Sequence, residues 1–134
     1  MYNHPLFYWL MCTFYLKSFN PKDEISKPHF FILNKGNNSG KPLLAPCPNC
    51  FVIIAENQEQ AEQLRTFCYA LWRCRSFEQH LNGSVIPFIT IRSFRSVMAF
   101  HIPIIEQYAA DFAQTVQALK LLEEREQQLT KTLR

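Results

Sequence analysis

Residues 50–81 read CFVIIAENQEQAEQLRTFCYALWRCRSFEQHL, which predicts a buried strand followed directly by a helix. The first six residues form a continuous apolar run rich in β-branched side chains, which is typical of a buried strand. Asn57 is a suitable N-cap and Gln60 stands three residues after it, so we expect the helix to begin at Gln58. Apolar residues then recur at helical spacing up to Leu81, where Asn-Gly supplies the expected stop.

Two other apolar stretches predict further strands. Residues 29–33 (HFFIL) lie between Pro28 and a turn at Gly36, which suits a short buried strand. Residues 84–91 (SVIPFITI) predict a third strand, and Pro87 places it at a sheet edge or a bulge. The sequence therefore predicts an α+β fold in which about three short strands pack against the central helix.

The C-terminal region is expected to be helical. Residues 92–101 (RSFRSVMAFH) predict a short helix that stops at Pro103. Residues 104–134 contain neither Gly nor Pro and predict one long helix with apolar residues on a seven-residue repeat. Its last turns extend beyond any core that three strands could supply, so we expect the protein to pair with itself or with another protein. The expected contact residues are Ile105, Tyr108, Phe112, Leu119 and Leu122. Packing of the same residues on the sheet is the alternative.

We expect a single domain overall. It comprises an N-terminal apolar segment with a polar linker (residues 1–27), an α+β core (28–103) and the long C-terminal helix (104–134). A chain of 134 residues is long enough for one sizeable core. Its 48% hydrophobic and 19% charged residues are typical of a globular protein and exclude a disordered one.

The N-terminal segment carries an apolar run over residues 6–16 (LFYWLMCTFYL). A membrane-spanning helix needs about 20 residues, and neither a basic region nor a small-residue cleavage site flanks this run. We expect a buried helix or strand here; the alternative is a surface element that docks on a membrane or a second subunit. The five cysteines, an odd number without a secretion signal, indicate reduced thiols and a cytoplasmic protein.

Residues 34–50 read NKGNNSGKPLLAPCPNC, and this loop holds the candidate sites. A nucleotide phosphate loop requires four residues between its glycines and a Ser or Thr after its lysine. Here three residues separate Gly36 from Gly40, and a proline follows Lys41, so that motif is excluded. A looser anion-binding loop that uses Lys35 and Lys41 is still consistent with the sequence.

Cys47 and Cys50 form the motif CPNC at the end of this loop. In thioredoxin-like proteins such a pair opens a helix that lowers the pKa of the first thiol. Here a strand follows, so we do not expect redox catalysis. The intervening Pro-Asn favours a turn that brings both sulfurs to one side, which is half of a zinc site. Our first expectation is no cofactor, with the cysteines packing as small apolar side chains. A zinc ion at Cys47 and Cys50, completed by ligands from separate elements or from a second subunit, is the alternative.

Motifs and charge give little support for an enzyme. Neither Gly-x-Ser-x-Gly nor His-Glu-x-x-His occurs, and the paired carboxylates fall in charged helical stretches. A net charge of +3 without any block of like charge is modest for a nucleic-acid-binding protein. We expect a non-enzymatic interaction protein without a small-molecule substrate. The alternative is a nucleic-acid-binding accessory module that contacts phosphates through Lys35, Lys41, Arg92 and Arg95.

Several segments together resemble an uncharacterised family of short bacterial proteins. The shared pattern comprises NKG at residues 34–36, NSGKP at 38–42, PCPNCF at 46–51, Leu71-Trp72, and GSVIPF at 83–88. The likeness covers residues 28–100. It implies a domain of unknown function in a cytoplasmic bacterial protein associated with mobile elements of gut anaerobes. The resemblance implies no activity, substrate or catalytic residue.

Overall fold

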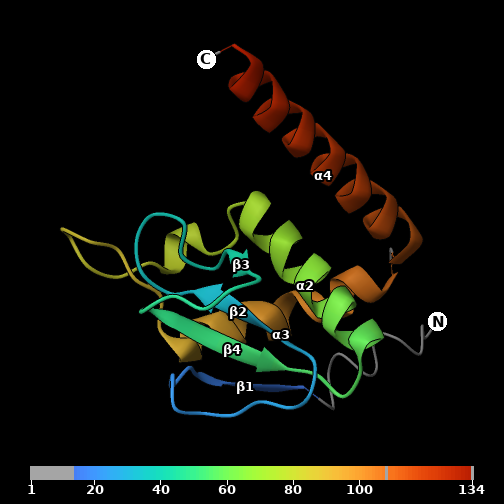
Figure 1. Cartoon of the computed structure of the whole chain (residues 1–134). Coiled ribbons are helices and arrows are strands. Elements are labelled where there is room, and N and C mark those ends of the chain that lie inside the picture. The colour runs from blue at the N-terminus through green and yellow to red at the C-terminus, as the bar shows by residue number, and fades with distance from the viewer. Residues whose placement is uncertain (1–13, 108, 134) are drawn as a thin grey trace.

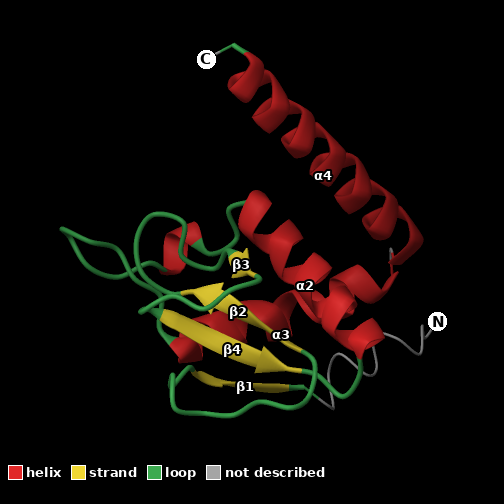
Figure 2. Ribbon diagram, in the orientation of Figure 1, coloured by secondary structure: helices red, strands yellow, loops and turns green. Residues whose placement is uncertain are grey.

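The structure, a computed structural model, describes residues 14–107 and 109–133 and has an α+β fold, as the sequence predicts (Figures 1 and 2). The elements in chain order are β1 (Tyr15–Ser18), β2 (His29–Leu33), β3 (Pro42–Leu43), β4 (Cys50–Ile54), α2 (Gln58–Arg73), the 3-10 helix η1 (Glu78–His80), α3 (Ile91–Gln107) and α4 (Ala109–Thr132). In the described residues, one small sheet is combined with three α-helices, of which α4 is the longest.

The four strands form one antiparallel sheet in the order β1-β4-β2-β3. β4 lies between β1 and β2, with Ile53 opposite both Leu16 and Phe30. Side chains on one face of the sheet pack with α2 and α3 into the main core, where Leu64, Phe67 and other helix residues are buried. In Figure 1, α3 lies behind the sheet and α2 runs beside it.

The other face of the sheet is also covered at its centre. Phe31, Cys50 and Val52 are buried there beneath partly buried side chains that include Phe19 and Ile25 of the β1–β2 connection. A strand buried on both faces needs apolar residues at every position instead of alternating ones. This double burial explains the continuous apolar runs of β2 and β4.

The sheet contains two strands, β1 and β3, that were not part of the expected three-stranded sheet, and it does not contain one of the expected strands. β1 includes Tyr15 and Leu16, the end of the N-terminal apolar run for which a buried helix or strand was expected, and the two-residue β3 was not expected; residues 6–13 of that run lie outside the described part. The expected strand over residues 84–91 is wrong. That segment makes only isolated bridges, Asn82 with Phe88 and Lys35 with Phe88, and α3 already begins at Ile91.

Helix α2 begins where the sequence predicts. The side chain of Asn57 accepts a hydrogen bond of 2.8 Å from the backbone N–H of Gln60. The Gln60 side-chain oxygen in turn accepts one of 2.7 Å from the N–H of Glu56. Two N–H groups at this end are therefore satisfied by side chains, which is the purpose of a capping box.

The expected end of this helix at Leu81 is wrong, because α2 stops at Arg73. The N–H of Arg75 donates to the carbonyl of Trp72 (3.0 Å), and the N–H of Ser76 donates to that of Leu71 (2.9 Å). These two bonds form a Schellman motif, which usually has glycine at the position of Arg75. Arg75 adopts the required left-handed φ of 60° without being glycine, so the sequence carries no stop signal there.

The expectation that Pro103 halts a helix is also wrong, since Pro103 lies inside α3. Proline removes one helical N–H donor, and the carbonyl left without a partner belongs to the residue four positions earlier, Ala99. Ala99 is exposed, so water can hydrate this carbonyl. The helix expected over residues 104–134 is accordingly divided between the end of α3 and α4.

The glycine-rich loop between β2 and β3 is held by its own backbone. Gly40 donates to the carbonyl of Leu33 (2.7 Å), and Gly36 donates to that of Pro87 (2.6 Å). Gly40 is buried, and a Cβ at this position would overlap the ring of Phe77. Phe77 stacks on Phe94 of α3 with 5.0 Å between ring centroids. The loop is therefore docked on the main core.

This contact predicts different costs for the same substitution at two glycines. We expect Gly40→Ala to lower the free energy of unfolding by about 3 kcal/mol or more, since the new methyl group displaces Phe77 and the φ of +100° disfavours alanine. Gly36 has a similar φ of +96° but open space around it, so Gly36→Ala should cost only about 1 kcal/mol. Urea denaturation measures both. Equal losses would contradict the docking of the loop on Phe77.

The left-handed arginine predicts a stabilising substitution. Arg75→Gly should raise the free energy of unfolding by about 1 kcal/mol, because glycine relieves the left-handed strain. Arg73→Gly is the matched control: it lies in the last turn of α2, where glycine costs about 1 kcal/mol. Thermal unfolding of both variants should show shifts of opposite sign. A loss of stability in both would show that Arg75 is not the residue that ends α2.

Candidate functional site

The cysteine pair packs into the second face of the sheet. The thiol of Cys50 donates to the carbonyl of Cys47 (3.2 Å), and the thiol of Cys47 donates to that of Asn49 (3.3 Å). Cys50 is buried and Cys47 is half-buried beside it. Burial raises the pKa of the Cys50 thiol, and the neighbouring Cys47 thiol acts in the same direction. Both cysteine side chains thus pack in the small apolar cluster with Phe31 and Val52.

The described residues contain no group of three His, Cys, Asp or Glu side chains placed to share a metal ion. Of the other cysteines, Cys68 lies fully buried in the main core, where burial strongly raises the pKa of its thiol. Cys74 is exposed at the end of α2. A metal at Cys47 and Cys50 would therefore need donors from outside this part of the chain.

The four cations proposed for phosphate contact do not form one patch. The Lys41 ammonium lies over the Trp72 ring, 4.9 Å from its centroid, next to β3. The Arg95 guanidinium donates to the carbonyl of Leu16 (3.3 Å) in β1. Since β1 and β3 are opposite edges of the sheet, these two cations lie far apart. Lys35 is bridged to Phe88, and Arg92 is exposed in the first turn of α3.

Trp72, over whose ring Lys41 lies, lines a cleft that the sequence did not predict. The cleft has a volume of about 360 Å³ and lies between the loop residues 37–39 and the segment that ends α2. Its lining includes Trp72, Arg73 and Arg75. The Arg73 guanidinium carbon lies 6.0 Å from the Trp72 ring centroid, so two cations flank this indole. The arginines were missed because residues 58–81 were expected to form one continuous helix, which places them on its surface.

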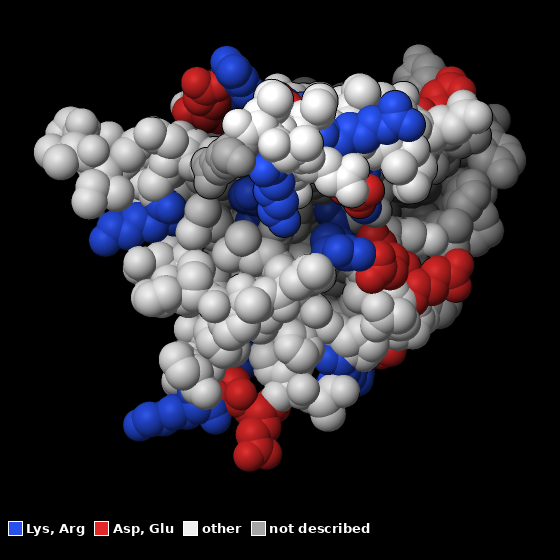
Figure 3. Space-filling model, turned by 45° about the horizontal axis from the view of Figure 1, so that its top comes forward, with Lys and Arg blue, Asp and Glu red and all other residues white. Residues whose placement is uncertain are grey.

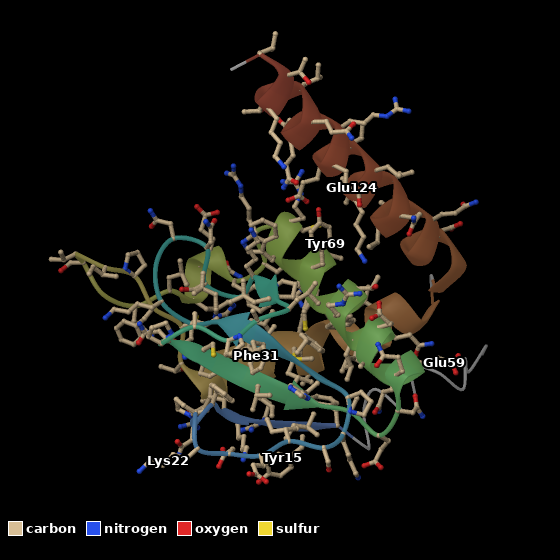
Figure 4. All side chains as sticks on the ribbon, viewed as in Figure 1. Tyr15, Lys22, Phe31, Glu59, Tyr69 and Glu124 are labelled. Atoms are coloured by element: carbon tan, nitrogen blue, oxygen red, sulfur yellow. The ribbon has the colours of Figure 1, made fainter. Side chains whose placement is uncertain are left out.

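Helix α4 is attached to α2 by few contacts, most of them polar. Val116 is the one side chain of α4 that is buried among those described. Lys120 lies 3.5 Å from the Thr66 hydroxyl and 5.8 Å from the ring centroid of Tyr69, while the Tyr69 hydroxyl donates to Glu123. Partial burial lowers the pKa of Lys120, and nearby Arg65 adds to this effect. Figure 4 shows Tyr69 on the side of α2 that faces α4.

The rest of α4 leaves the body of the protein. Figure 1 shows its C-terminal end projecting away from the sheet. Of the five expected contact residues, Leu119 is half-buried and Leu122 is 64% exposed. Leu129 and Leu133, on the same repeat, are 61% and 83% exposed. Tyr108 and the side chains of Ile105 and Phe112 lie outside the described part.

On one face of the molecule (Figure 3), the charged side chains do not gather by sign. On the face shown in Figure 3, lysines and arginines stand beside aspartates and glutamates, separated by uncharged side chains. In the part of the chain that the structure describes, every helix is too short or too polar to cross a membrane.

Thiol burial predicts the order in which the described cysteines react. At pH 7.5 iodoacetamide should modify Cys74 first, then Cys47 and then Cys50, whereas Cys68 should react only on unfolding. Because the pKa of Cys50 is raised, its rate should still increase at a pH where an ordinary thiol has reached its maximum. Mass spectrometry of the alkylated peptides measures each rate. A fast reaction at Cys50 would reveal an activated thiolate and contradict a purely packing role.

Comparison with curated proteins gave no match, and comparison with solved structures gave none either. A family model does match, over residues 16–134, which is almost the entire described chain. Its first matched residue, Leu16, lies in β1, and the match extends through α4, so it includes the cleft and the projecting helix. The chain therefore belongs to a family of unknown function, DUF6943.

Proposed function

We propose that this protein is a non-enzymatic interaction protein that pairs with a second copy of itself through α4. The observation that carries this proposal is the stripe of exposed leucines on the projecting half of the helix, Leu122, Leu129 and Leu133. Burying one leucine side chain stabilises an interface by about 1.5–3 kcal/mol. Such residues on one helix face are typical of a surface that is covered in the functional state.

Helix stability supports the same conclusion. An isolated helix is marginally stable in water, and most helices in proteins are stabilised by packing of an apolar face. Val116 and a few polar contacts near Lys120 fix the first half of α4 on α2. Hydrogen bonds of the Thr130 and Thr132 hydroxyls go to carbonyls within the same helix. A partner would stabilise the second half of α4 by packing against it.

A second copy of this chain suits the stripe better than an unrelated partner. Leu122 and Leu129 are seven residues apart, so they lie about 20° apart around the helix and form a seam of the kind found in helix pairs. One seam can pack against the same seam of a second copy around a twofold axis.

The cellular setting is also part of the proposal. The four described cysteines are free thiols, which suits the reducing cytoplasm. The resemblance to short bacterial proteins supports a bacterial protein carried with mobile elements. Nucleic-acid binding by Lys35, Lys41, Arg92 and Arg95 has less support, because Lys41 and Arg95 lie at opposite edges of the sheet.

Light scattering coupled to size-exclusion chromatography tests the pairing. At about 50 µM the full chain should elute with twice the mass of a monomer. The double variant Leu122→Glu/Leu129→Glu should weaken pairing by at least about 100-fold and elute as a monomer, because it places charges in the seam.

Lys131→Glu is the matched control for this experiment. It changes the net charge by the same two units, but residue 131 lies about 200° around the helix from residue 129, outside the seam. It should lower the affinity only a few-fold. Circular dichroism should show the same helix content in both variants at a concentration where each is monomeric. A monomeric parent chain, or equal losses in the two variants, would contradict pairing through the leucine seam.

A further inference from the structure

We propose that the cleft between the β2–β3 loop and the end of α2 binds the phosphate group of a small phosphomonoester. The cleft is lined by Trp72, Arg73 and Arg75 together with the loop residues 37–39, and the Lys41 ammonium lies beside it, over the Trp72 ring. It does not depend on α4, so it is independent of the pairing proposed above.

The loop wall of the cleft is rigid and offers polar groups. The backbone bonds of Gly36 and Gly40 fix both ends of the segment, and the buried Ser39 donates from its hydroxyl to the Gly36 carbonyl (2.6 Å). Asn37 and Asn38 stand exposed between these points. Their backbone N–H groups donate no hydrogen bond to any described residue. Two amides in a fixed turn are thus available to an oxyanion.

The opposite wall supplies the positive charge. Arg73 and Arg75 are exposed, and neither guanidinium forms an ion pair with a described residue. A guanidinium presents N–H donors in a planar fork that matches two phosphate oxygens. Trp72 holds the Lys41 ammonium over its ring. Two guanidinium groups in the lining and one ammonium beside the cleft therefore come from two segments far apart in the sequence.

The charge balance indicates the class of anion. The one acidic residue that lines the cleft is Glu78. Its carboxylate opposes the two guanidinium groups of Arg73 and Arg75 in the lining. The Lys41 ammonium over the Trp72 ring adds a third positive charge beside the cleft, so the surplus around the cleft is two. A phosphomonoester carries nearly two negative charges at neutral pH, so it matches this surplus. A phosphodiester of a nucleic-acid backbone carries one and matches it less well.

The backbone at Arg75 points to the same role. A non-glycine residue in the left-handed region costs about 1–2 kcal/mol, and glycine would end α2 without that cost. Such strain is concentrated at functional sites. The left-handed turn places Arg75 at the rim of the cleft, where its guanidinium can approach an anion held by the loop. A volume of about 360 Å³ suits a phosphorylated small molecule.

Isothermal titration calorimetry of the full chain at low salt and pH 7.5 tests this site. Inorganic phosphate and adenosine 5′-monophosphate are the probes, and both should bind with a dissociation constant of about 1 mM or below. A single-stranded oligonucleotide that lacks terminal phosphates tests the alternative ligand, the phosphodiester backbone of a nucleic acid. It should bind more weakly per phosphate than the two monoester-type probes. Tighter binding of the oligonucleotide would overturn the monoester assignment in favour of a nucleic acid.

Four variants make the test specific. Arg73→Gln and Arg75→Gly should each reduce the affinity for phosphate at least about tenfold. Arg75→Gly should weaken phosphate binding although it stabilises the fold, so its loss of affinity cannot be caused by unfolding. Glu78→Gln should increase the affinity, because it removes the opposing carboxylate. Arg92→Gln, an exposed arginine outside the cleft, should leave it unchanged.

Two results would overturn the proposal. One is the absence of binding heat with either monoester probe up to about 10 mM. The other is a loss of affinity in Arg92→Gln equal to that in Arg75→Gly, which would show general charge attraction without a site.

Discussion

The position of β4 between β1 and β2 is the constraint on which the rest of the structure depends. Its residues pair on both sides and are buried on both faces, so the strand can be formed only from apolar residues. The chain enters α2 after three residues, and this helix closes the main core over one face. The β2–β3 loop lies at the β3 edge of the sheet, with Gly40 against the ring of Phe77.

Structural features that depend on residues close together in the sequence could be predicted. The apolar runs of β2 and β4 and the cap at Asn57 are local features, and the structure has all three. The misassigned segments depend on contacts between distant residues. Residues 84–91 have β propensity, but Asn82 and Phe88 close that segment on itself through a pair of backbone hydrogen bonds. β3 exists because Pro42 and Leu43 lie opposite Ile32 and Phe31, which no local pattern reveals.

The candidate sites divide in the same way. The glycine-rich loop was singled out from its composition, and its residues 37–39 do line a cleft, with Lys41 over the ring of neighbouring Trp72. Its partners Arg73 and Arg75 could not be assigned to that cleft, because the helix stop between them has no glycine. Lys41 and Arg95 were grouped wrongly, because only the strand order of the sheet shows that they lie at opposite edges. For α4, the seven-residue repeat identified the leucines, and the structure adds that Leu122 and Leu129 are exposed.

The pairing of the first strand with the last has a kinetic consequence. Tyr15 lies opposite Ile54, so the two partners are separated by more than 30 residues of chain. Such non-local contacts form slowly, because the entropy of closing a long segment is lost before the contact stabilises it. During synthesis, the N-terminal residues must wait on the ribosome until β4 and the helix behind it have emerged. Tyr15 and Leu16 spend that interval without a partner strand, and unpaired strands of this kind are prone to aggregation.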